Sequence, residues 1–79
     1  MNKLVIGGIY KHFKGHVYKI IAVARDAEDL SEKIVYQNVN NLEDIWVRDK
    51  DEFLSLVDRE KYPEVNQEFR FQLLENEQD

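Results

Sequence analysis

The chain has 79 residues and no cysteine, which limits it to one small domain without disulfides or cysteine-ligated zinc. A core of this size is thin, so its stability must come from close packing, with or without self-association. No segment approaches the roughly 20 apolar residues of a membrane span, and the first residues lack the apolar run of a signal peptide. We therefore expect a bacterial cytoplasmic protein without a membrane partner.

The charges are divided unevenly along the chain. The net charge is −5, yet residues 1–25 carry five basic residues and no acidic one, and all 16 acidic residues follow. A basic segment of this kind either binds an anion or lies beside acidic neighbours in the fold. Five spaced cations are a weak electrostatic signal, so both interpretations stay open.

The first two predicted strands form a hairpin. Residues 9–13 have the pattern of a short strand, and Lys14 and Gly15 supply a turn because glycine accepts positive φ. Residues 17–24 form the strongest strand of the sequence. Its first half alternates polar and apolar residues and its second half is apolar, which is typical of a strand that becomes covered on both faces.

A second hairpin follows a polar loop at residues 25–32. Residues 34–39 and 45–48 are rich in β-branched and aromatic residues, and the asparagine-rich segment 40–43 between them predicts a turn. This hairpin supplies the third and fourth strands.

The hydrophobic period changes after Asp49. Asp49 and Glu52 have the spacing of a capping box, in which each side chain accepts a hydrogen bond from a backbone N–H group at the start of a helix. Phe53, Leu56 and Val57 then lie at helical spacing. These residues predict a short helix over residues 50–58.

The C-terminal part predicts one more strand. Residues 59–67 contain the only proline and predict a surface connection, and the alternation of Phe69, Phe71 and Leu73 predicts the last strand.

We therefore expect one domain over residues 1–79, with an ordered core at about 7–74 and a frayed tail at 75–79. The predicted fold is mainly β, a small five-stranded SH3-like or partly open barrel with one short helix. The alternative is a curved antiparallel sheet with the helix packed on one face.

Few residues are suited to catalysis. The chain has no threonine, and neither Ser31 nor Ser55 lies on a strand-to-helix elbow. His12 and His16 flank the first turn, and two histidines without a nearby carboxylate make a weak metal site. The glycines match no phosphate-binding loop. We expect no cofactor and no metal. The residues argue against an enzyme without excluding one.

Aromatic and basic residues alternate in the first hairpin and include Tyr10, His12, Lys14 and Tyr18. Such surfaces in small barrels stack bases or hold phosphates. Equally, the rings can be core residues with solvated lysines between them. Trp46, the only tryptophan, shares a strand face with Arg48 and is either a stacking platform or a core residue.

The sequence also resembles a small bacterial domain, domain-of-unknown-function family 1653. The most specific part is the opening Gly-Ile-Tyr-Lys-His-Phe-Lys-Gly at residues 8–15, and the similarity extends to about Leu74. The family pattern has histidine where this chain has Asp26, and proline where it has Asp49. No activity is implied by the resemblance. It implies that the family shares ten residues: Tyr10, His12, Phe13, Lys14, Gly15, Arg25, Glu28, Tyr36, Trp46 and Arg48.

Our leading hypothesis is a non-catalytic binding module for an anionic or planar ligand. A nucleic acid, a nucleotide and an acidic peptide of a protein partner all fit this description. The candidate ligand-binding residues are His12, Lys14, Arg25, Trp46 and Arg48, with Tyr10, Glu28 and Tyr36 as secondary candidates.

Two other hypotheses remain. The first is a structural or interaction domain that forms a homodimer or docks onto a partner through a sheet edge or an apolar patch. The second is a small enzyme in which His12 works with Glu28 or Glu32 as a general base.

Overall fold

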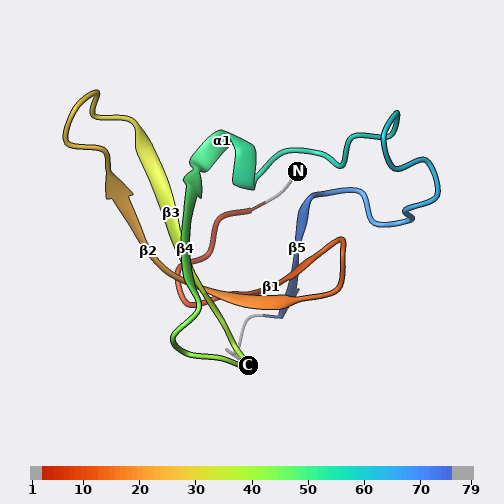
Figure 1. Ribbon diagram of the computed structural model, residues 1–79, viewed down its shortest axis with the longest axis horizontal. Coiled ribbons are helices and arrows are strands. Elements are labelled where there is room, and N and C mark those ends of the chain that lie inside the picture. Colours follow the sequence, from red (N-terminus) through yellow and green to blue (C-terminus); the bar gives the residue numbers. More distant parts are fainter. Residues whose placement is uncertain (1–2, 76–79) are drawn as a thin grey trace.

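The computed structural model describes residues 3–75, which form one antiparallel sheet and one short helix (Figure 1). The five strands lie in the order β4-β3-β2-β1-β5. In chain order the elements are β1 (Ile9–His12), β2 (Val17–Arg25), β3 (Glu32–Asn38), β4 (Ile45–Asp49), α1 (Lys50–Phe53) and β5 (Phe71–Glu75). The first four strands form a meander, and β5 returns to pair with β1.

The sheet is bent rather than closed. In Figure 1, β1 crosses at a steep angle to β3 and β4. A bulge contributes to the bend, because the pairing of β2 with β3 shifts register between Ile20 and Ala22. Within residues 3–75, β4 and β5 are the two edges and do not pair with each other. The predicted mainly β fold with five strands and one short helix is therefore confirmed, and the sheet does not form a closed barrel.

The turn between β1 and β2 forms as its sequence predicts. The His12 N–H group donates to the carbonyl oxygen of His16 at 2.8 Å, and Gly15 N–H donates to the His12 carbonyl at 2.8 Å. Gly15 has a φ of 111°, which a residue with a side chain adopts only with strain. The turn holds Phe13 and Lys14 at the end of the hairpin.

The core is built mainly of aromatic rings. Tyr10, Tyr36, Phe53 and Phe71 are buried together with Ile20 and Ile34. The Phe53 and Phe71 rings stack with centroids 4.0 Å apart, and Phe53 meets Tyr10 and Tyr36 edge to face. Aromatic pairs in these geometries stabilise a core beyond the area that they bury.

The helix is shorter than predicted, and the capping box is wrong. Helix α1 ends at Phe53, and the Asp49 side chain makes no capping hydrogen bond. Its carboxylate instead binds the Lys33 ammonium across the β3–β4 pair. Phe53 and Val57 are buried, but Leu56 is exposed because the chain has left the helix and bridges to Phe69.

The connection between α1 and β5 is held by side-chain bonds to its own backbone. The Arg59 guanidinium donates to the carbonyl oxygens of Val65 and Gln67. The Gln67 amide donates to the carbonyl oxygens of Lys11 on β1, at 2.9 Å, and of Phe69, at 2.8 Å. These bonds fasten the connection to the β1–β2 hairpin. The predicted frayed tail lies outside the described residues from 76 onward.

Candidate functional site

Two adjoining hollows lie at the end of the β1–β2 hairpin, and His12, Lys14 and Arg48 line both. The first, which we call the aromatic hollow, has a volume of about 280 Å³ and is completed by His16, Tyr18, Tyr36, Trp46 and Phe71. The second, the basic hollow, has a volume of about 230 Å³ and is completed by Phe13, Asp58, Lys61, Tyr62 and Arg70.

Strand pairing explains why these residues meet. Tyr36 pairs with Trp46 across β3 and β4, and Ile34 pairs with Arg48. Because paired residues project from the same face, Trp46 and Arg48 lie on the face that carries the core. His12 pairs with Phe71 across β1 and β5 on the other side of the bent sheet. The bend brings the two groups together.

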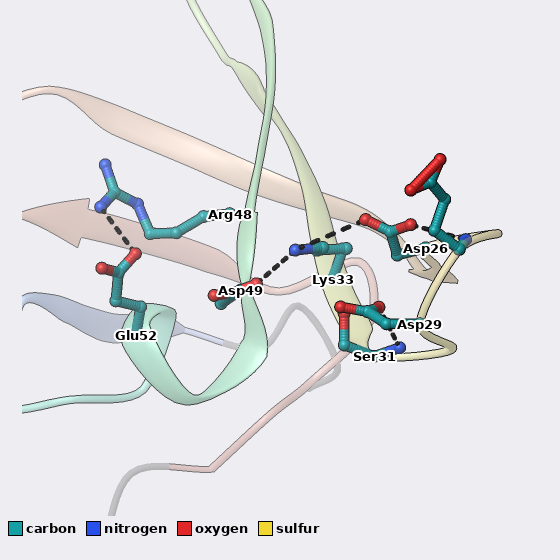
Figure 2. A network of polar contacts seen from close by, with 8 residues as sticks. Asp26, Asp29, Ser31, Lys33, Arg48, Asp49 and Glu52 are labelled. Atoms are coloured by element: carbon teal, nitrogen blue, oxygen red, sulfur yellow. Dashed lines mark hydrogen bonds and ion pairs between the residues drawn. The ribbon is translucent and has the colours of Figure 1, made fainter.

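Arg48 is held in place and keeps donors free. Its Nε donates to the Tyr36 hydroxyl at 3.2 Å, and its guanidinium carbon lies 5.7 Å from the centre of the Phe71 ring. One terminal nitrogen lies 3.5 Å from the Glu52 carboxylate on α1 (Figure 2). A guanidinium carries five N–H donors, so several remain without a protein acceptor among the described residues.

His12 is neutral at physiological pH. Burial and the positive charges of Arg48, Lys14, Arg70 and His16 lower its pKa from the ordinary 6.5 to about 4. The Lys14 backbone N–H donates to His12 Nδ1 at 3.1 Å. In a neutral imidazole the other nitrogen then carries the proton, so Nε2–H is the donor that the ring has left to offer.

His12 is also fixed by its neighbours. Its ring stacks on Phe13 with centroids 4.5 Å apart and meets Phe71 edge to face at 4.8 Å. The ring therefore forms part of the wall between the two hollows.

The basic hollow holds cations that lack acidic partners. Among residues 3–75, Lys14, Lys61 and Arg70 form no ion pair. The Lys14 ammonium instead lies 5.5 Å from the centre of the Tyr62 ring. The Nε atom of Arg70 is buried without a hydrogen-bond partner. A buried donor of this kind is costly unless a ligand or water satisfies it.

One carboxylate lines the basic hollow. Asp58 Oδ1 accepts hydrogen bonds from the backbone N–H groups of Glu60 and Lys61, at 3.0 and 3.3 Å. It stabilises the turn that carries Lys61 and Tyr62. The local charge around the hollow is positive although the net charge of the chain is −5.

The structure brings five of the eight candidates from the sequence to these hollows: His12, Lys14, Tyr36, Trp46 and Arg48. Trp46 is 50% exposed, so it is a surface ring and not a core residue.

The other three candidates lie elsewhere. The Tyr10 ring is fully buried, and its hydroxyl donates to the Lys3 carbonyl oxygen and accepts from Val5 N–H. Arg25 pairs with Glu32 at the far end of β2. Glu28 is exposed, and its backbone N–H donates to the Asp26 carboxylate.

The proposed partners of His12 in an enzyme are also absent from the site. Glu28 and Glu32 line neither hollow. All the charged groups that shift the pKa of His12 are cations. The described residues contain no group of three or more His, Asp or Glu side chains arranged to hold a metal ion.

Sequence reasoning missed the residues that the α1–β5 connection supplies, chiefly Lys61, Tyr62 and Arg70. No motif marks them, because they approach His12 only through the path of an irregular segment. Tyr18 and His16 belong to the β1–β2 hairpin, whose aromatic and basic residues are evident in the sequence. Alternation alone does not show which face of that hairpin is concave, so it does not place these two residues in the site.

A larger hollow of about 450 Å³ lies beside the β2–β3 loop and α1. Its lining carries five carboxylates and two cations, Lys33 and Lys50, and both cations are paired. Lys33 lies between Asp49 and Asp26, and Lys50 Nζ lies 2.9 Å from Glu32 (Figure 2 shows the Lys33 pairs). Partly exposed pairs of this kind stabilise the loop modestly. The remaining carboxylates leave this hollow negatively charged, which disfavours an anionic ligand there.

Comparison with known protein families identifies the family of this chain. The model of the family described as "Protein of unknown function (DUF1653)" matches residues 8–73. The chain belongs to this family. No curated protein and no solved structure matches the chain significantly. Among the described residues, no helix is long and apolar enough to cross a membrane.

The two residues that the resemblance led us to regard as departures from the family pattern meet in the structure. Asp26 and Asp49 stand where the resemblance led us to expect histidine and proline, and both carboxylates lie against the ammonium of Lys33. Asp49 lines the larger hollow beside α1, and neither carboxylate lines the hollows around His12. The departures therefore leave the candidate site unchanged.

Proposed function

We propose that this DUF1653 domain is a non-catalytic binding module for an anionic ligand that carries a planar group. The observation that supports it most is the junction of the two hollows at His12, Lys14 and Arg48. One side offers aromatic walls and the other offers unpaired cations. The absence of cysteine is consistent with action in a reducing compartment, and we propose the bacterial cytoplasm.

The chemistry of the site favours binding over catalysis. A general base needs a nitrogen or oxygen that is free to accept a proton, and its pKa must lie near the pH at which the enzyme works. His12 instead uses Nδ1 to accept the Lys14 N–H bond, and its pKa of about 4 is far below neutrality. A neutral ring with one N–H donor, beside fixed cations, is suited to orienting an acceptor group on a ligand.

An NMR titration with inorganic pyrophosphate at low salt tests the proposal. We expect saturable shifts of the backbone amides at Lys14, Gly15, Arg48 and Arg70. Lys14→Ala should weaken binding, and Lys19→Ala, which removes the same charge from an exposed position of β2, should not. Equal weakening by both variants, or no saturable shifts, would overturn the proposal.

A second candidate function, homodimerisation, is favoured by one observation. The edge strand β4 exposes Ile45, Trp46 and Val47 at 55%, 50% and 59%, and a free edge with apolar side chains favours pairing with another strand. Light scattering over a range of concentrations tests it. A monomer at all concentrations would eliminate this candidate.

A further inference from the structure

The two hollows have the dimensions of one divided site. Small-molecule sites usually have volumes of about 300–1,000 Å³. At about 280 and 230 Å³, each hollow alone falls below that range, and the two together lie within it. His12, Lys14 and Arg48 line both, so the hollows adjoin at these side chains, and a ligand in both would pass over the His12 ring between them.

The two parts differ in chemistry. On the aromatic side, Trp46 is half exposed and lies on the same sheet face as Tyr36. A half-exposed indole offers a stacking surface to a planar group. Tyr18 meets Tyr36 edge to face at 5.0 Å, which fixes the floor of this hollow.

On the basic side, Lys14, Lys61 and Arg70 have no acidic partner among the described residues. The Arg70 Nε is a buried donor without an acceptor. Phosphate oxygens are strong acceptors for guanidinium and ammonium groups.

We propose that the ligand is a single nucleotide, with its base against Trp46 and its phosphate among Lys14, Lys61 and Arg70. This inference rests on the proposed function and names the ligand class for the same site. Arg48 and the Nε2–H of His12 lie at the junction, where the sugar and its phosphate ester join the two ends.

The charge of the whole chain favours a single nucleotide over a strand. Binding of a long polyanion draws on many cations along a stripe. Here the cations are confined to one hollow, and the net charge of −5 repels the rest of a strand. We therefore expect little gain in affinity from additional nucleotides.

Calorimetry at low salt with adenosine 5′-monophosphate, adenosine and inorganic phosphate tests the inference. Trp46, as the only tryptophan, gives a second readout through its fluorescence. We expect the nucleotide to bind more tightly than either part and to quench the fluorescence. Trp46→Leu should weaken nucleotide binding at least about fivefold, the lower end for a stacked base, and leave phosphate binding unchanged.

Matched controls separate the outcomes. Val47→Ala changes an exposed residue of the same strand on the opposite face, and Arg25→Ala removes a charge far from the hollows; both should retain nucleotide binding. If phosphate binds as tightly as the nucleotide and Trp46→Leu has no effect, the nucleotide inference fails while the anion site stands. If neither ligand binds, both proposals fail. Affinity that rises steeply with oligonucleotide length would also overturn the single-nucleotide inference.

Discussion

The ionisation of His12 should make folding depend on pH in a defined window. Its pKa is lowered to about 4 in the folded chain, by burial first and by the surrounding cations second, from an ordinary value of 6.5. At pH 7.5 and above the ring is almost entirely neutral in both states and contributes little pH dependence. Between pH 6.5 and 4 the unfolded chain binds a proton that the folded chain does not, so stability falls as the pH falls.

The size of the effect follows from the same difference. A fully buried group with this pKa difference would account for about 3 kcal/mol between its two limits. Because the ring is only partly buried, solvent screening should reduce this to about 1–2 kcal/mol. Somewhat more than half of the loss should occur between pH 7.5 and 5, where most carboxylates remain ionised.

Urea unfolding of the wild type and of His12→Asn at pH 7.5 and 5.0 measures this contribution. The asparagine oxygen can still accept the Lys14 N–H bond, so we expect the variant to lose about 1 kcal/mol of the pH dependence between these two pH values. His16→Asn, in the same hairpin, is the matched control and should keep most of the His12 contribution, since His16 is the smallest of the causes that lower the pKa of His12. A His12→Asn variant with an unchanged pH dependence, or a His12 ring that titrates near pH 6.5 in NMR spectra, would refute the reasoning.

Three further changes test the account of the fold and the site. Phe53→Ala should lower the free energy of unfolding by about 3–5 kcal/mol, because Phe53 is fully buried in the ring cluster; Leu42→Ala, at an exposed site, should cost little, and equal urea midpoints would contradict the core described here. Leu30→Asn should raise stability by up to about 1 kcal/mol in urea unfolding, since Leu30 is exposed with a φ of 62°, and a loss of stability would show that its side chain packs. Glu52→Gln should tighten pyrophosphate binding about two- to fivefold by releasing Arg48 from a partly exposed ion pair; the same change at Glu43, which lines neither hollow, should not, and weaker binding by Glu52→Gln in calorimetry would contradict the role given to Arg48.

The sequence predicted the strands well because their signals are local. Alternation and the Lys14–Gly15 turn are properties of neighbouring residues, and the structure has strands and a turn at those places. The helix was predicted too long because Phe53 and Val57 have helical spacing and both are buried. Only Phe53 lies in α1, and Val57 is buried in the irregular segment that follows the helix. The prediction of a capping box was wrong because the Asp49 carboxylate binds the Lys33 ammonium on the neighbouring strand. Sequence spacing does not reveal this contact.

The site was predictable only in part, for a similar reason. His12, Lys14, Trp46 and Arg48 lie on strands or a tight turn, so their faces follow from alternation once the register is known. Lys61 and Arg70 line the basic hollow because of the path of the irregular α1–β5 connection. No pattern among neighbouring residues in the sequence predicts that path. Arg25 lines neither hollow, because it lies at the far end of the nine-residue strand β2.

The pKa of the His12 ring with and without pyrophosphate tests the central claim most directly. In the free chain the positive charges of Arg48, Lys14 and Arg70 help to lower that pKa to about 4. An anion bound among those cations neutralises them, so we predict that saturating pyrophosphate raises the pKa of His12 in an NMR titration. A pKa that stays the same at every pyrophosphate concentration would contradict the claim that this hollow binds an anion.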